Sequence, residues 1–154
     1  MKQMTDLMLS GGVNHFVPHA FDPKLKDPDH PPHFFEGGKY PQYEAFAQLM
    51  AYTKRISHLL SGGRHQADVA VYYNAEAEWA GGKFQLQQEV CKVLSQNQIA
   101  FDLVYQDLMP DCVISQGKMF LRGITYRALV VPYSQYLPVP VLEIFHRMAE
   151  EGLP

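Results

Sequence analysis

The chain has 154 residues, of which 47% are hydrophobic and 19% are charged, and its formal net charge is −3 at pH 7. This composition is typical of a globular protein that buries a core, and it excludes a disordered or fibrous chain. The negative charge and the lack of a Lys/Arg cluster argue against a nucleic-acid-binding protein, and no apolar run reaches the roughly 18 residues of a membrane span.

The first 63 residues hold few predicted elements. KQMTDLMLSGG is typical of the last part of a helix that stops at a glycine pair, and VNHFVPH (residues 13–19) favours a strand. A long loop rich in proline and histidine follows, and a loop of this length within a compact domain is usually a binding loop or a lid. Residues 40–61 then predict an amphipathic helix that ends at Gly62 and Gly63.

From residue 66 onward, strands and helices alternate. ADVAVYYN (67–74) is a nearly unbroken apolar run, as expected for a strand covered on both faces, and NAEAEWAGG (74–82) predicts a turn-rich loop. We expect further strands at 100–107 and 127–134, helices at 83–98 and 139–152, and a small hairpin over 112–126. This order predicts an α/β fold, a flavodoxin-like three-layer parallel sheet with local strand order 2-1-3.

The domain organisation follows from these patterns. Residues 66–154 predict a partial flavodoxin-like domain, and residues 1–63 hold too few elements for a domain of their own. The chain opens within a helix and closes after one, so we expect it to be a segment of a longer protein. Its opening residues lack the long apolar stretch of a secretion signal, and nothing indicates a compartment.

Four histidines gather near the start of the chain. On a strand, His15 and His19 would point to the same face about 13 Å apart, too far for one metal ion unless the strand ends between them at Pro18. His30 and His33 lie in the loop, where ligands are not held on fixed elements, so we expect no metal site. His19, at the end of a strand, is a candidate for hydrogen bonding to a ligand or is simply structural. A metal-dependent hydrolase that uses all four histidines stays an alternative.

The segment after the first strand of the sheet carries a second candidate group. Glu76 and Glu78 suggest paired carboxylates and Trp79 a stacking platform for a sugar ring, although glutamates in loops are most often only solvated. No glycine-rich phosphate loop is present, so no cofactor is expected. Neither Ser134 nor the two cysteines, Cys91 and Cys112, lie in a nucleophile motif.

Several motifs together resemble a known class of enzyme. GVNHFVPHAF, KYPQY and RISHLLSGG resemble the last barrel repeat of large bacterial glycoside hydrolases, in which a (βα)8 barrel is followed by a flavodoxin-like domain. ADVAVYYNAEAEWAGG and YRALVVPYSQYLPVPVLEIFHRMAEEG are similar to that following domain, which is the trimerisation domain in β-galactosidases.

The resemblance implies a last barrel-repeat remnant at residues 1–63, with His15, His19 and Phe21 at the rim of a carbohydrate site and Trp79 as a further contact. A single barrel strand would have an unpaired edge, so we expect a homo-oligomer. The catalytic carboxylates of such enzymes lie on earlier barrel strands and match no residue here, so the segment alone is expected to be non-catalytic. The alternative is a free-standing, small flavodoxin-like module that binds a ligand or acts in signalling.

Overall fold

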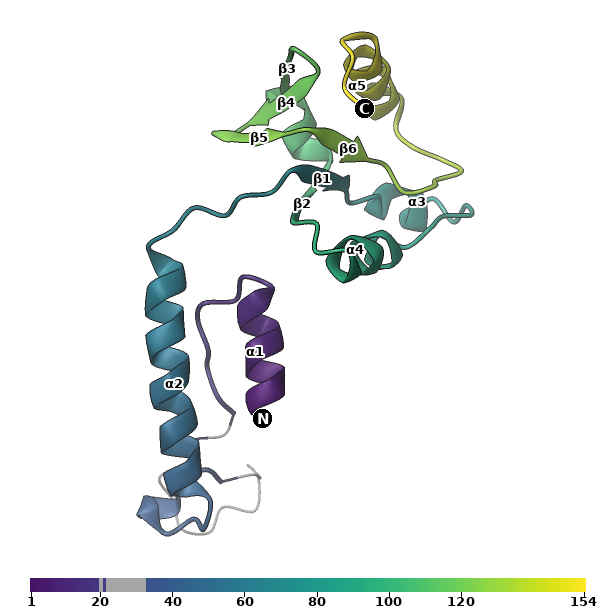
Figure 1. Ribbon diagram of the computed structural model, residues 1–154. Coiled ribbons are helices and arrows are strands. Elements are labelled where there is room, and N and C mark those ends of the chain that lie inside the picture. Colours follow the sequence, from purple (N-terminus) through teal and green to yellow (C-terminus); the bar gives the residue numbers. More distant parts are fainter. Residues whose placement is uncertain (20, 22–32) are drawn as a thin grey trace. The chain divides into compact units, whose positions relative to one another are not determined.

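A computed structural model describes residues 1–19, 21 and 33–154 of the chain. Most of the proline- and histidine-rich loop, including His30, lies outside the described residues. The chain divides into two compact units, Met1–His65 and Gln66–Pro154, and each is described by itself (Figure 1). Their assignment to a barrel-repeat remnant and a partial flavodoxin-like domain stays a prediction.

Unit 1 is built on two helices, α1 (Lys2–Ser10) and α2 (Tyr43–Ser61), with the short 3-10 helix η1 (Glu36–Gly38) before α2. The predicted glycine stop of α1 is confirmed. Gly12 has φ +91, a conformation that favours glycine, and the amide of Val13 donates to the carbonyl of Met8 at 3.0 Å. The amide of Gly12 donates to the carbonyl of Leu9 at the same distance, so the last turn is closed by a Schellman motif.

The strand that we expected at residues 13–19 is not formed. Figure 1 shows this segment as an extended trace beside the two helices, without a strand arrow. A strand needs a neighbour that accepts and donates its backbone hydrogen bonds, and no described segment of unit 1 pairs with it. The strand prediction was therefore wrong about the pairing. Phe16, Val17 and Pro18 of this segment help to line a cavity of about 270 Å³ together with residues of α1 and α2.

Unit 2 contains two sheets and three α-helices. Its elements are β1 (Val69–Tyr72), α3 (Ala75–Trp79), α4 (Gln87–Gln96), β2 (Phe101–Val104), η2 (Gln106–Asp111), β3 (Val113–Ser115), β4 (Lys118–Leu121), β5 (Ile124–Tyr126), β6 (Ala128–Val130) and α5 (Val139–Glu150). The strands β2-β1-β6 form a parallel sheet in that order, with Val69 opposite Phe101 on one side and Ala128 on the other. The predicted α/β class is confirmed.

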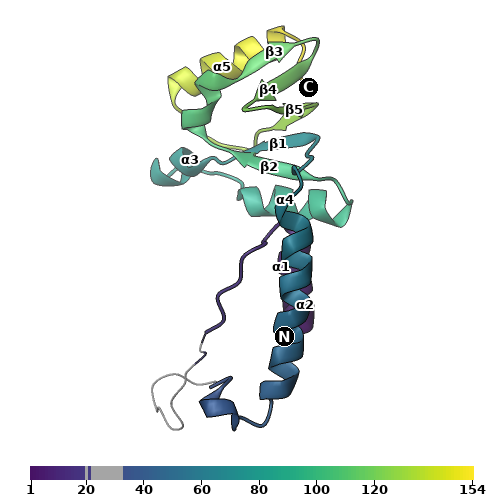
Figure 2. The same ribbon diagram turned by 90° about the vertical axis from the view of Figure 1, so that its left-hand side faces the viewer.

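Helices cover both faces of this sheet. Figures 1 and 2 show α4 on one face of the parallel sheet and α5 on the opposite face. The central strand β1 is accordingly buried along most of its length, as its apolar run predicted. The core between the sheet, α5 and the antiparallel strands contains the fully buried side chains of Tyr72, Met109, Met119 and Met148.

Two local predictions for unit 2 were incomplete. The hairpin predicted over 112–126 is formed by β3 and β4, and β5 adds a third antiparallel strand that was not predicted. Both turns have positive φ at two successive residues, Gln116-Gly117 and Arg122-Gly123. Such turns match the twist of paired strands. The predicted loop after β1 contains α3, because Ala75 and Ala77 turn into the core on a short helix. Within the described part of the chain, no helix is both long and apolar enough to cross a membrane.

Candidate functional site

Three of the four predicted contact residues lie in unit 1. His15 and His19 are exposed on the extended segment after α1. The side chain of Phe21 is 51% exposed, and its ring stacks on Phe35 with centroids 4.8 Å apart and on Phe46 at 6.3 Å. The structure thus places Phe21 at the open side of an aromatic cluster, with the two histidines on the segment that precedes it in the chain.

The aromatic cluster is larger than the sequence suggested. The buried ring of Phe34 stacks on Phe46, which lies in the first turn of α2, with centroids 4.6 Å apart and planes 4° from parallel. Tyr40 meets Phe34 edge-on at 6.3 Å, and Tyr43 meets Phe35 edge-on at 5.2 Å. Of these rings, sequence reasoning singled out only Phe21. The close spacing of aromatic residues just before α2 was the available signal.

A cavity of about 570 Å³ lies beside this cluster. It is lined by Met1, Lys2, Phe34, Gln42, Ala45, Phe46, Gln48, Leu49 and Tyr52. Its walls are mainly apolar with a few polar groups, as is usual for small-molecule sites. None of its lining residues is an aspartate or glutamate. Its apolar walls therefore suit a ligand with an apolar face, but the described residues do not bring to it the two carboxyl groups that cleavage of a glycosidic bond requires.

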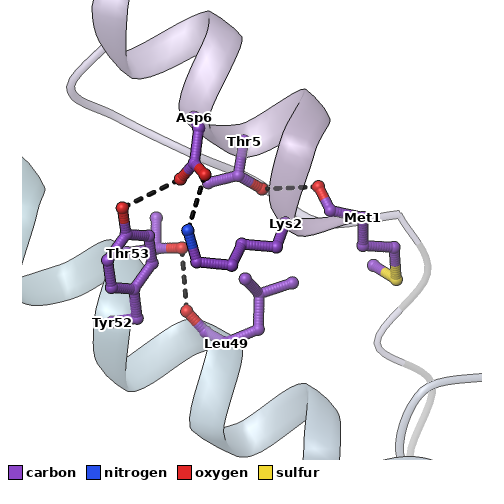
Figure 3. Close-up of polar contacts among 7 residues, drawn as sticks. All are labelled: Met1, Lys2, Thr5, Asp6, Leu49, Tyr52 and Thr53. Carbon is purple, nitrogen blue, oxygen red and sulfur yellow. Dashed lines mark hydrogen bonds and ion pairs between the residues drawn. The ribbon is translucent and has the colours of Figure 1, made fainter.

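One wall of this cavity carries a polar network that joins α1 to α2 (Figure 3). The Lys2 ammonium lies 2.6 Å from a carboxylate oxygen of Asp6, and the Tyr52 hydroxyl donates to the other oxygen at 2.8 Å. The hydrogen bond from Lys2, followed by that from Tyr52, lowers the pKa of Asp6. Asp6 is therefore held ionised, which suits a structural contact and not a general acid.

The fourth predicted residue, Trp79, lies at the end of α3 in unit 2, and its side chain is 80% exposed. Just before α3, the side chain of Asn74 is only 2% exposed. Its amide group donates to the carbonyl of Gln85 at 3.1 Å and to the hydroxyl of Ser134 at 2.9 Å. Asn74 thus connects the segments after β1 and β6, a link that sequence reasoning did not find.

The carboxylates and nucleophiles of this region have structural partners. Glu76 accepts a hydrogen bond of 3.1 Å from the hydroxyl of Tyr72, whose pKa is raised by burial and then by the charge of Glu76. Glu78 is two positions along the same helix, where side chains do not face each other, so the two glutamates do not form a catalytic pair. The Ser134 hydroxyl donates its proton to the carbonyl of Pro132 at 3.1 Å.

The remaining reactive side chains also lack the features of a catalytic or metal site. Burial raises the pKa of both Cys91 and Cys112, which disfavours the reactive thiolate. Among residues 1–19, 21 and 33–154, no three His, Cys, Asp or Glu side chains are grouped so as to hold a metal ion. The four-histidine alternative includes His30 and so falls partly outside the residues that the structure describes.

Comparison with known proteins gives one match. The family Glyco_hydro_106, described as alpha-L-rhamnosidase, matches the chain over residues 1–154. No curated protein and no solved structure matches it.

Proposed function

The chain belongs to the alpha-L-rhamnosidase family of glycoside hydrolases, and from this premise we propose that it is part of an enzyme that removes α-L-rhamnose from a carbohydrate. The match over all 154 residues is the observation that carries this proposal. The largely apolar cavity beside the aromatic cluster supports a ligand with an apolar face, as a sugar has.

Within this enzyme, we propose that residues 1–154 form substrate-contacting and packing surfaces while the catalytic carboxylates lie elsewhere in the protein. Glycoside hydrolysis generally needs two carboxyl groups about 5 to 9.5 Å apart, one on each side of the scissile bond. Asp6 and Glu76 are bonded to neighbouring side chains, and Asp102 accepts a hydrogen bond of 2.9 Å from Tyr126. These carboxylates have structural roles, which supports a non-catalytic segment.

The substrate contacts that we propose are His15, His19, Phe21 and Trp79. In the barrel interpretation, residues 13–19 are the last barrel strand, whose carboxyl end faces the substrate. The order helix, extended segment, helix in unit 1 supports this interpretation, because an extended segment that runs beside the helices before and after it is what a barrel repeat contains (Figures 1 and 2). Imidazole groups bind sugar hydroxyls, and the exposed rings of Phe21 and Trp79 suit the apolar face of a pyranose.

For unit 2 we propose the flavodoxin-like assignment and a role in packing between domains or subunits of a homo-oligomer. The order β2-β1-β6 with helices on both faces supports the assignment. Exposed apolar side chains on α4 and β2, among them Val93 and Leu103, support packing against another surface.

The test compares the 154-residue chain with the longer protein that we propose contains it. Both are assayed for hydrolysis of p-nitrophenyl α-L-rhamnopyranoside. The proposal predicts activity in the longer protein and none in the chain alone. Hydrolysis by the chain alone would overturn the non-catalytic role, and a longer protein that cleaves only other glycosides would overturn the substrate.

A further inference from the structure

We propose that the carboxyl edge of the β2-β1-β6 sheet is a carbohydrate-binding surface, in which Tyr133 and Tyr136 act with the proposed contact Trp79 to hold the apolar face of a neutral sugar. We call these three residues the aromatic edge. The choice of a sugar as ligand rests on the proposed function. The location of the surface and the choice of the two tyrosines are inferred from the structure of unit 2.

The topology brings exposed aromatic residues to one edge. In a parallel sheet all strands end at the same edge, which is where ligands bind in open α/β folds. Each of the three strands is followed closely by an exposed tyrosine: Tyr73 after β1, Tyr105 after β2 and Tyr133 after β6. Tyr133 is 61% exposed, and Trp79, which follows β1 through α3, is 80% exposed. Exposed apolar side chains mark an interaction site when they gather in one patch, in contrast to single exposed residues.

The backbone beneath the aromatic edge is held by hydrogen bonds. The amide of Gln85 donates to the carbonyl of Tyr133, and the amide of Gln135 donates to the carbonyl of Lys83, each at 2.8 Å. The amide of Lys83 donates in turn to the side-chain oxygen of Gln135 at 2.9 Å. Buried Asn74 ties both segments to the end of β1. The segments that carry the rings are therefore preorganised, which lowers the entropy cost of binding.

The ring of Tyr136 is positioned by a glycine. A Cβ atom added at Gly82 would lie 2.5 Å from Cδ2 of Tyr136, so the ring lies directly against the glycine backbone. The ring is nevertheless 53% exposed. Trp79 precedes Gly82 by three residues, and this stretch of chain spans at most about 11 Å. Trp79 and Tyr136 are thus close enough for one oligosaccharide to contact both.

The chemistry of the aromatic edge suits a sugar. The flat faces of exposed rings pack against the C–H face of a pyranose, and the methyl group of a 6-deoxy sugar such as rhamnose adds apolar area. The side-chain amide of Gln135, which donates to the Tyr136 hydroxyl at 3.3 Å, supplies neutral hydrogen-bonding groups beside the rings. A few polar groups at the margin of an apolar surface are what fix a ligand's orientation.

The chain contains a single tryptophan, so the fluorescence of Trp79 reports on this surface directly. We would titrate the full 154-residue chain with methyl α-L-rhamnopyranoside and follow the emission of Trp79. The proposal predicts a saturable change with a Kd on the order of 1 mM, and about two- to tenfold weaker binding for Tyr133→Ala and Tyr136→Ala. Tyr136→Phe keeps the ring and should bind within about twofold of the unsubstituted chain. Phe120→Ala removes another exposed aromatic side chain, on β4, and should leave the Kd unchanged.

Two results would overturn the proposal. One is binding that the tyrosine substitutions do not weaken, with circular dichroism showing that the variants are folded. The other is a Trp79 emission that changes with the protein concentration but not with the sugar concentration. That result would indicate that the aromatic edge is a contact between copies of the chain. Either result leaves the proposed rhamnosidase function intact, because hydrolysis by the longer protein tests that function separately.

Discussion

Asn74 and Ser134 are 60 positions apart, yet the buried amide of Asn74 donates a 2.9 Å hydrogen bond to the hydroxyl of Ser134. The same amide also donates to the carbonyl of Gln85. One side chain thereby fixes the two segments that carry the exposed rings of unit 2. This contact makes the carboxyl edge of the sheet a defined surface, and it can be tested by substitution.

Asn74→Ala should destabilise unit 2. The substitution removes two hydrogen bonds. The Gln85 carbonyl loses this donor in a partly buried place, while the Ser134 hydroxyl keeps its bond to the Pro132 carbonyl, and the loss costs about 1–3 kcal/mol. Urea denaturation measures the difference in the free energy of unfolding. Asn97→Ala is the matched control, because the exposed Asn97 side chain bonds only to Val93 in its own helix and its loss should cost less than about 0.5 kcal/mol. Equal costs for the two variants would contradict this role of Asn74.

Gly82→Ala should displace the ring of Tyr136. The new methyl group would lie 2.5 Å from a ring carbon, well inside van der Waals contact, so the ring or the loop has to move. We expect a loss of stability of about 1–3 kcal/mol, or altered NMR shifts of the Tyr136 ring if the loop yields. Gly63→Ala is the control, because a Cβ atom there meets nothing within 4 Å. An unchanged Tyr136 ring spectrum together with unchanged stability would show that the contact is absent in solution.

Adjacent residues on β4 should differ sharply in their contribution to the core. Met119 is fully buried in the cluster beneath α5, whereas its neighbour Phe120 is exposed. Met119→Ala should cost about 2–5 kcal/mol through lost burial and the cavity left behind. Phe120→Ala should cost much less although it removes a larger side chain. Thermal and urea unfolding compare the two, and a larger cost at Phe120 would contradict the observed strand register.

The pKa of Asp6 should depend on Tyr52. The pKa of Asp6 is lowered in the folded chain by hydrogen bonds from Lys2 and then from Tyr52. A lowered carboxyl pKa contributes stability above its unfolded value of about 3.9, and this contribution is lost as the pH falls through the folded pKa. Tyr52→Phe removes one donor and should raise the pKa of Asp6, measured by NMR titration of its carboxyl carbon. Tyr105→Phe, in unit 2, should leave it unchanged, and no rise in Tyr52→Phe would contradict the network.

Much of the fold was predictable because it is encoded locally. The helical spacing of residues 43–61, the glycine pair after α1 and the apolar run of β1 each carry their own signal, and the structure confirms all three. α3 was missed because a helix of five residues is too short to show a period. The strand predicted at 13–19 failed for another reason: pairing depends on a neighbour, which the residues of the strand itself do not specify.

The site was less predictable, because its contacts join distant residues. Phe21 was identified from its position, but its stacking partners Phe35 and Phe46 were not. Glu76 and Glu78 look alike in sequence, and only the helical turn between them shows that they point apart. The link from Asn74 to Ser134 had no local signal. The predicted contacts at His15, His19, Phe21 and Trp79 stay predictions.

The most direct test of the central claim is the kcat/KM of the longer protein for p-nitrophenyl α-L-rhamnopyranoside, measured for His19→Ala and for His58→Ala as control. His58 is exposed in the last part of α2 and is not among the proposed contacts, so its loss should leave kcat/KM unchanged. If His19 contacts the substrate at the barrel rim, its loss should lower kcat/KM about tenfold or more. A His19→Ala enzyme as active as the His58→Ala control would contradict the claim that this segment contributes to the rhamnoside site.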